Sequence, residues 1–125
     1  MKLQQQVTSL ELSKRLKELG VKQWSLFYWS IADDRKTMEI RYQTYVSEVN
    51  EETVPYYSAF TVAELGEMFP QEYTSQKGLI YGGYWVCGIW NVQEEQELQK
   101  ARTEADARAK MLIYLLENNL INIKE

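Results

Sequence analysis

Histidine is absent from these 125 residues, and Cys87 is the one cysteine. Histidine is the side chain that titrates near neutral pH without help from its surroundings, and it is the commonest ligand of transition metals. Acid–base catalysis would therefore depend on carboxylate, Lys or Tyr groups with strongly shifted pKa values. A single cysteine excludes an intramolecular disulfide and any multi-cysteine metal site. These absences favour a binding module over an enzyme, with no catalytic residue, metal or cofactor assigned.

Proline and glycine are also scarce, with 2 and 6 residues, which argues against a disordered or fibrous chain. The length and the hydrophobic content of 45% suit one core, so we expect a single domain spanning residues 1–125. No stretch reaches the roughly 18 apolar residues of a membrane span, and the N-terminus is too polar for a signal peptide. Together with the lone cysteine, this predicts a cytoplasmic protein without a membrane partner.

Positive charge is in the minority, because 14 Lys and Arg face 18 Asp and Glu, a net charge of −4. This balance argues against broad binding to nucleic-acid phosphates. Lys14, Arg15, Lys17 and Lys22 form a basic run in the first predicted helix. We interpret this run as a solvated helix face, with a local basic patch as the alternative.

Three predicted helix starts share one pattern, a Thr followed three residues later by an acid. The pairs are Thr8 with Glu11, Thr61 with Glu64 and Thr103 with Asp106. In a capping box, the Thr oxygen accepts the third backbone amide and the acid reaches back to the cap. Gly20 and Asn118-Asn119 then suit left-handed helix ends. The last helix is apolar on more than one side, which predicts a buried central helix.

Two early segments have the composition of strands. Residues 24–31 are almost continuously apolar, and residues 38–46 alternate apolar with polar side chains, with a turn expected at 33–36. Residues 56–60 are a candidate third strand. Gly82-Gly83 predicts a second hairpin between strands at 79–81 and 84–90. The polar stretch 93–102 suits a loop, with a frayed extension of the last helix as the alternative.

The predicted element order is α-β-β-(β)-α-β-β-α. We interpret it as an α+β domain, in which three helices cover one face of an antiparallel sheet of four or five strands.

Aromatic residues are plentiful, with four Trp and nine Tyr. A binding platform for a base, sugar or peptide side chain is predicted from Tyr56, Tyr57, Trp85 and Trp90. Arg41 is the first candidate partner for an anionic ligand, followed by Lys77 and Arg108. The alternative is that these aromatic side chains fill a small core and pack across strands.

Other polar groups fit structural roles better than chemical ones. Acidic residues cluster at Asp33-Asp34 and at Glu48, Glu51 and Glu52, without the ligand spacing of a calcium loop. We therefore assign no metal site. Gly82-Gly83 lacks the Lys-Ser/Thr that follows a phosphate-binding loop. Cys87 lies in a predicted strand and suits a small buried hydrophobe with a raised pKa.

Three blocks of the chain resemble a group of small uncharacterised proteins encoded by phages and prophages. They are residues 10–20 with 25–29 (LELSKRLKELG and SLFYW), 60–70 (FTVAELGEMFP) and 105–118 (ADARAKMLIYLLEN). The blocks cover about a third of the chain and are chiefly helix and core patterns. The resemblance brings no activity and no catalytic residue. It implies a mobile-element context, in which small domains often regulate or counter host systems.

The first functional hypothesis is a non-enzymatic phage or prophage accessory module that binds a protein partner. That partner includes a second copy of the chain, paired through an exposed hairpin edge. The alternative is a binding or sequestering protein for a nucleotide-type small molecule, using the aromatic platform. A carboxylate-based hydrolase with a divalent cation is the third class, and it has the least support.

Overall fold

The computed structural model describes residues 2–32, 34–42, 56–70, 73–78, 82–88 and 98–121. Within them the chain forms an α+β fold, as expected. The helices are the short 3₁₀ helix η1 (Leu3–Gln5) and the α-helices α1 (Leu10–Glu18), α3 (Val62–Met68) and α4 (Glu104–Glu117). The strands are β1 (Phe27–Ile31), β2 (Met38–Tyr42), β3 (Tyr56–Ala59), β4 (Thr74–Lys77), β5 (Trp85–Gly88) and β6 (Gln99–Ala101).

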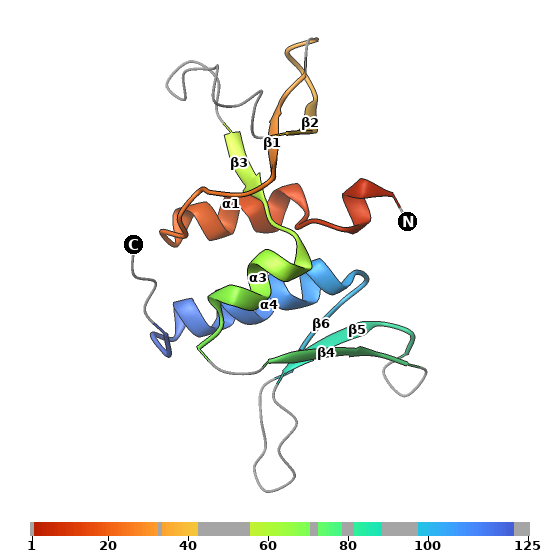
Figure 1. The fold of residues 1–125 in the computed structure, drawn as a ribbon, viewed down its shortest axis with the longest axis vertical. Helices are drawn as coiled ribbons and strands as arrows, with labels where there is room; N and C mark the ends of the chain where they lie inside the picture. Colours follow the sequence, from red (N-terminus) through yellow and green to blue (C-terminus); the bar gives the residue numbers. More distant parts are fainter. Residues whose placement is uncertain are drawn as a thin grey trace, which may run out of the picture.

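In this part of the chain the strands form two three-stranded antiparallel sheets, ordered β2-β1-β3 and β4-β5-β6. Figure 1 shows one sheet at each end of the molecule, with the three α-helices between them. These residues therefore do not form the predicted single sheet of four or five strands with helices on one face. Sequence periodicity predicts which residues form strands, but not which strands pair. Here each sheet consists of one hairpin and the strand that follows it in the chain.

The element order differs from the prediction at one strand. The bracketed strand is present as β3, but β6 lies at the end of the predicted 93–102 loop, while residues 93–97 lie outside the described part. Gln99 and Lys100 give β6 no apolar pattern. It is a strand because it pairs with β5, with Ala101 opposite Trp85. Tertiary pairing here outweighs local propensity.

The two predicted hairpins are present, with shifted strands. Asp34 Oδ1 accepts the amides of Lys36 and Thr37 at 2.8 and 3.0 Å, which closes the first turn, although Asp33 lies outside the described residues. In the second hairpin β4 begins at Thr74, earlier than the predicted strand at 79–81, which also lies outside them. Gly82 and Gly83 have φ angles of +70° and +81°. Glycine adopts such angles without steric strain, which explains the pair.

One of the three predicted capping boxes is complete. Thr61 Oγ1 accepts the Glu64 amide at 3.2 Å, and Glu64 Oε1 accepts the Thr61 amide at 2.9 Å. Thr103 accepts the Asp106 amide, but the Asp106 carboxylate turns to α1, where it accepts the Ser9 amide at 2.8 Å. The shorter Asp side chain leaves the reciprocal bond unmade.

The predicted cap at Thr8 is wrong, because the cap residue of α1 is Ser9. Thr8 is fully buried, and its Oγ1 accepts the Phe60 amide at 3.1 Å and lies 2.6 Å from Ser13 Oγ. The Thr8 amide donates to the Phe60 carbonyl at 2.9 Å. Thr8 therefore joins the N-terminal segment to the start of α3.

Left-handed residues end α1 and α4, as predicted. Gly20 has a φ of +91°, and the Val21 amide donates to the Leu16 carbonyl at 3.1 Å. Asn119 has a φ of +55°, and the Leu120 amide donates to the Leu115 carbonyl at 2.9 Å. Both are Schellman motifs, which satisfy the last carbonyls of a helix.

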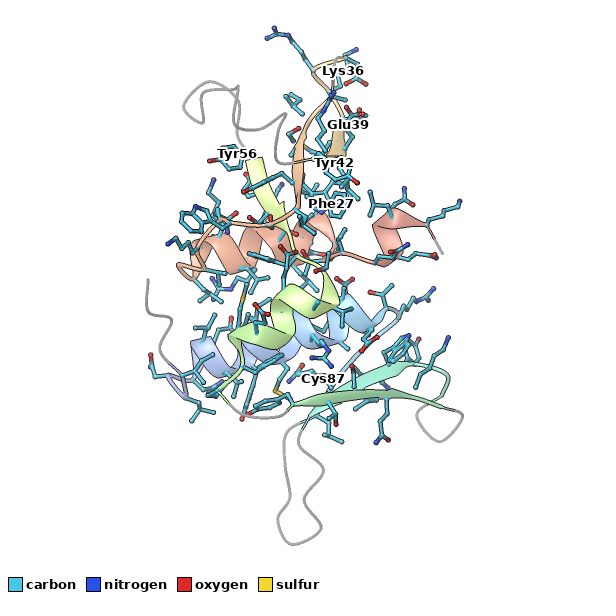
Figure 2. All side chains as sticks on the ribbon, in the orientation of Figure 1. Phe27, Lys36, Glu39, Tyr42, Tyr56 and Cys87 are labelled. Carbon is cyan, nitrogen blue, oxygen red and sulfur yellow. The ribbon has the colours of Figure 1, made fainter. Side chains whose placement is uncertain are left out.

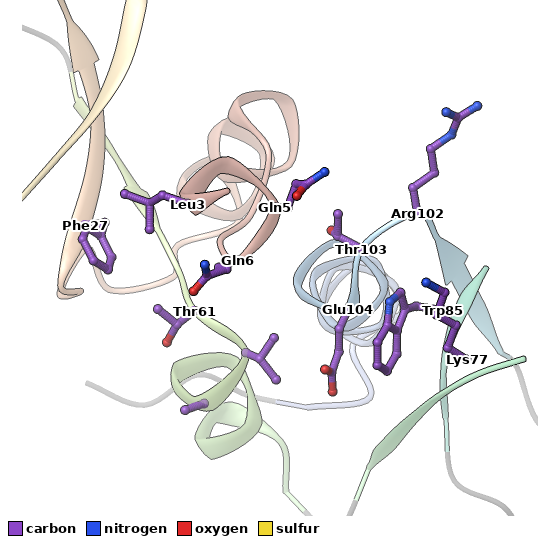
Figure 3. A pocket seen from close by; sticks show the side chains of 12 residues that line it. Leu3, Gln5, Gln6, Phe27, Thr61, Lys77, Trp85, Arg102, Thr103 and Glu104 are labelled. Carbon is purple, nitrogen blue, oxygen red and sulfur yellow. The ribbon is translucent and has the colours of Figure 1, made fainter. Parts of the chain in front are cut away.

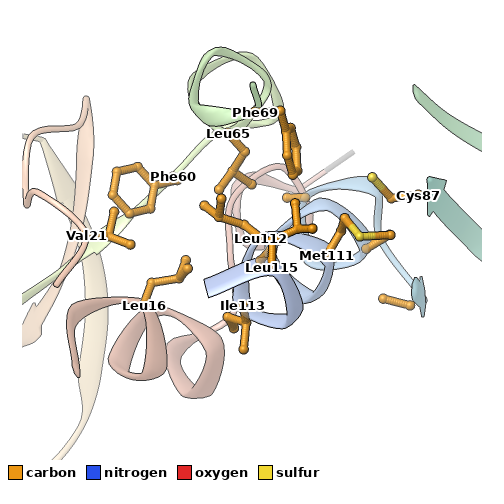
Figure 4. Packing of buried hydrophobic residues seen from close by; sticks show 14 residues of the cluster. Leu16, Val21, Phe60, Leu65, Phe69, Cys87, Met111, Leu112, Ile113 and Leu115 are labelled. Atoms are coloured by element: carbon orange, nitrogen blue, oxygen red, sulfur yellow. The ribbon is translucent and has the colours of Figure 1, made fainter. Parts of the chain in front are cut away.

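The core surrounds α4, which is buried on more than one side, as predicted. Seven of its side chains are buried: Ala105, Ala107, Ala109, Met111, Leu112, Ile113 and Leu115. In Figure 4 they meet Leu16 and Phe60 on one side and Phe69 and Cys87 on the other. One helix thus separates the two sheets and contributes to a single continuous core.

Among the described residues, Ser13, Ser30 and Ser58 are fully buried, and their surroundings differ. Ser13 Oγ has Thr8 as its partner, whereas Ser30 Oγ and Ser58 Oγ make no hydrogen bond. A buried hydroxyl without a partner is less favourable than a methyl group of similar shape.

Removing an unpartnered hydroxyl should not weaken the fold. We expect Ser58→Ala to be neutral or stabilising by up to about 1 kcal/mol, and the control Ser13→Ala to destabilise by about 1–2 kcal/mol. Urea denaturation followed by circular dichroism measures both. Equal losses in the two variants would contradict the assignment.

The Asp106 carboxyl predicts a pH dependence. Burial raises its pKa above the usual 3.8, against the opposing effect of its bond from Ser9. Because the folded-state pKa is the higher one, its contribution to stability is greatest below about 3.8 and is lost as the pH rises through the folded-state pKa. Asp106→Asn keeps an acceptor for Ser9, so it should be more stable than the unchanged protein at pH 7 and equal to it in acid.

Asp34→Asn is the matched control with the opposite sign, because hydrogen bonds from Lys36 and Thr37 lower the pKa of Asp34. This variant should be less stable at pH 7, with the difference disappearing in acid. Urea midpoints measured between pH 3 and pH 7 test both. An Asp106→Asn protein that is weaker at pH 7 would show that the charged Ser9 contact outweighs burial.

Candidate functional site

A cleft of about 470 Å³ lies where η1, the starts of α3 and α4, and the β4-β5-β6 sheet meet (Figure 3). This volume is within the range of about 300–1,000 Å³ that is typical of small-ligand sites. Its lining residues come from segments far apart in sequence: Leu3, Gln5, Gln6, Phe27, Thr61, Val62, Ala63, Lys77, Trp85, Arg102, Thr103 and Glu104.

One side of the cleft carries an aromatic ring with positive charge. Lys77 on β4 pairs directly with Trp85 on β5, so both side chains project from the same face of the sheet. Figure 3 shows them close together, whereas Arg102, which also lines the cleft, extends its guanidinium away from them. Trp85 is half-buried, and both cations are exposed. A flat ring with one adjacent cation, and a second cation at the rim, are thus available to a ligand.

Glu104 is the acidic residue that lines the cleft. Its negative charge is partly neutralised by Arg108, which does not line the cleft. Its carboxylate accepts the Ser75 hydroxyl and lies 3.6 Å from Arg108 Nε, which also donates to Ser75 Oγ at 3.1 Å. By contrast, neither Lys77 nor Arg102 forms an ion pair within the described part of the chain. The cleft therefore favours an anion.

The two helix starts contribute shape more than charge. Thr61 Oγ1 and Thr103 Oγ1 each accept an amide of the following turn, and the Glu64 carboxylate of α3 accepts the Thr61 amide. These caps use part of the donor capacity of the helix starts. The positive character of the cleft consequently comes from Lys77 and Arg102.

The opposite side combines apolar and uncharged polar groups. Leu3 of η1 and Phe27 of β1 lie across from the Trp85 side in Figure 3, with Gln6 and Thr61 beside them. The Thr8–Phe60 bonds and the bridge between Val7 and Thr61 hold the N-terminal segment there. A ligand could place an apolar part against Leu3 and Phe27 and an anionic part beside the cations.

The structure does not bring the predicted site residues together. Trp85 lines the cleft, but Tyr56 and Tyr57 lie on β3, in the other sheet (Figure 2). Lys17 Nζ lies 4.9 and 5.2 Å from the centres of these two rings, so both tyrosines have a cation–π contact with α1. Trp90 lies outside the described residues.

Arg41 is also away from the cleft. It lies on β2 and forms an ion pair with Glu39 of the same strand. Of the secondary candidates, Lys77 lines the cleft, and Arg108 acts behind it through Glu104. The basic run on α1 is partly used in structural contacts, since Arg15 Nη2 lies 2.7 Å from Glu117 Oε2.

Sequence reasoning missed Arg102 and the opposite side of the cleft. One signal was available, because Thr61 and Thr103 mark two capped helix starts, and both line the cleft. Their meeting depends on α3 packing beside α4, which sequence periodicity does not encode.

Cys87 and the acidic groups add no second site. Cys87 is fully buried, and burial raises its pKa to about 11, with Arg108 opposing the shift. The described residues contain no cluster of three or more Cys, Asp or Glu that could hold a metal, and Glu48, Glu51 and Glu52 lie outside them. None of the helices in this part has the length and apolar character to span a bilayer.

No family model, curated protein or solved structure matches the chain. The assignment of the cleft therefore rests on its own geometry.

The burial of Cys87 predicts low reactivity. Since the thiolate is the reacting form, a thiol with a pKa of about 11 and no exposure should react far more slowly with a disulfide reagent at pH 8 than the urea-unfolded chain does. The single cysteine makes the absorbance change easy to assign. Equal rates for folded and unfolded protein would contradict the burial.

Proposed function

We propose that this protein binds a small anionic ligand that carries a flat ring, of the nucleotide type, in the cleft. The observation that supports this proposal is the placement of Trp85, Lys77 and Arg102 around one cleft of about 470 Å³. The sequence-based expectation of a nucleotide-type ligand is retained, but of the described residues in the predicted aromatic platform only Trp85 lines the cleft.

The ring of the ligand is the first element of recognition. Trp85 is half-buried and lines the cleft, so its indole offers an aromatic surface. Stacking of a base on an aromatic side chain contributes about 1–3 kcal/mol and tolerates different bases. Trp85 thus supports recognition of a ring system without choosing between bases.

The anionic group is the second element. Lys77 is adjacent to Trp85 through the β4–β5 register, and Arg102 precedes α4 on the same side of the cleft. Each charge-assisted hydrogen bond contributes about 1.5–3 kcal/mol when the partner is held in place. One cation beside the ring and a second at the rim of the cleft suit a phosphate joined to a base through a sugar.

Binding without catalysis is part of the proposal. Cys87 is buried with a raised pKa, which argues against its use as a nucleophile. Ser75 Oγ is held between Glu104 and Arg108 and links β4 to α4. Both groups therefore have a structural explanation.

The protein-binding hypothesis, with its phage or prophage context and its role against a host system, remains a separate prediction. Sequestration of a signalling nucleotide would be compatible with that context. Contact with a second copy of the chain has support of its own at the edge of β2, described below.

The ligand proposal predicts a thermal shift. Nucleoside monophosphates and diphosphates should raise the melting temperature, since a ligand at 100 times its Kd adds about 2.7 kcal/mol of stability. The matching nucleosides and inorganic phosphate should each give a smaller shift. Trp85→Leu should lose most of the shift relative to its own unliganded form, whereas Trp24→Leu, at an exposed site outside the cleft, should retain it.

Charge variants complete the same experiment. Lys77→Gln should reduce the shift and make it less sensitive to salt, whereas Lys36→Gln, in the β1–β2 turn, should not. The absence of a shift with every nucleotide would refute the proposal. A melting-temperature shift that is unchanged in both Trp85→Leu and Lys77→Gln would show that the ligand binds outside this cleft.

A further inference from the structure

Strand β2 is the outer strand of the β2-β1-β3 sheet, and among the described residues it pairs only with β1. Figure 1 shows it at the edge of the sheet, at the end of the molecule away from β4, β5 and β6. An edge strand presents backbone donors and acceptors that can pair with another strand. No residue of β2 lines the cleft.

The side chains of β2 divide between two faces. Alternation places Glu39 and Arg41 on one face and Met38, Ile40 and Tyr42 on the other. Glu39 and Arg41 form an ion pair along the strand. Tyr42 is 64% exposed, with its ring centre 4.9 Å from that of Phe27. The edge strand thus has a charged face and an apolar face.

We propose that β2 pairs antiparallel with β2 of a second copy of this chain, around a two-fold axis at Ile40. In that register Ile40 faces Ile40 of the copy, and Met38 faces Tyr42. Glu39 faces Arg41 and Arg41 faces Glu39, so opposite charges meet at both positions. Directly opposite pairs of unlike charge and of apolar side chains stabilise antiparallel strands. The strand is complementary to itself.

The neighbouring registers are disfavoured by the same charges. A shift that centres the pair on Arg41 places the two guanidinium groups opposite each other, and a shift that centres it on Glu39 does the same for two carboxylates. If the two-fold axis lay between two neighbouring residues, charged side chains would face apolar ones. Charges on edge strands commonly prevent pairing, but here their order permits one register and opposes the others.

The interface should be small. Each chain contributes the five residues of β2. The area that they bury should be smaller than the roughly 1,200–2,000 Å² of a standard stable interface. We therefore expect a weak dimer that dissociates on dilution. Pairing would join two three-stranded sheets into one six-stranded sheet with continuous apolar side chains from Met38, Ile40 and Tyr42.

A charge-swap experiment tests the register. Glu39→Arg gives a chain with two positive residues on the charged face, and Arg41→Glu gives a chain with two negative residues. By sedimentation velocity across a concentration series, each variant alone should be monomeric, and an equimolar mixture should form a 1:1 dimer. The double variant Glu39→Arg with Arg41→Glu should dimerise like the unchanged chain. Circular dichroism checks that each is folded.

Cross-linking gives a second measurement that does not depend on charge. Residues facing each other at the two-fold axis have Cα atoms about 4.5–5.5 Å apart, within disulfide range. Ile40→Cys should therefore form an intermolecular disulfide under mild oxidation. The native Cys87 is buried, so it should not compete in this reaction. Tyr42→Cys is the control, since its two copies would lie roughly 13 Å apart along the strands, and it should not cross-link.

Two results would overturn the proposal. One is an unchanged chain that is monomeric at every concentration, which would leave the edge to another protein or to no partner. The other is a dimer that the single charge changes do not weaken, or that cross-links as readily through position 42 as through position 40.

Discussion

The burial of α4 on several sides is the constraint on which the rest of this fold depends. Its alanines at 105, 107 and 109 are fully buried, and its larger side chains fill the second half of the helix. Small side chains at the start allow neighbouring elements to approach, while Met111 and Leu112 fill the space beyond. Because α1, α3 and the β4-β5-β6 sheet all pack on this helix, it determines how far apart the two sheets lie.

Polar contacts then orient the segments around that helix. Asp106 connects the start of α4 to Ser9, Thr8 connects the N-terminal segment to Phe60, and Ser75 connects β4 to Glu104 and Arg108. These contacts converge near the cleft, so the cleft is formed by the same interactions that join the elements. A ligand there would contact Glu104 and residues of several elements that these contacts join, so its binding should stabilise their arrangement.

The cleft and the β2 edge carry separate proposals and involve different strands. The cleft brings together Trp85, Lys77 and Arg102, which are suited to an anionic ring. The β2 edge has alternating charges, which are suited to a strand of the same sequence. A dimer through β2 would leave the cleft of each copy outside the paired strands. One small domain can thus combine a ligand site with self-association.

Local features could be predicted from the sequence because their causes are local. The Thr61–Glu64 cap, the left-handed Gly20 and Asn119, the Gly82-Gly83 turn and the α+β class each depend on residues a few positions apart. The separation into two sheets, the strand at Gln99–Ala101 and the use of Thr8 as a tertiary contact depend on partners distant in the chain. The same holds for the site. Trp85 could be singled out as an aromatic candidate, and the β4–β5 pairing places Lys77 beside it. Only the packing of the helices completes the cleft, because its side chains come from six segments that meet only in the folded chain.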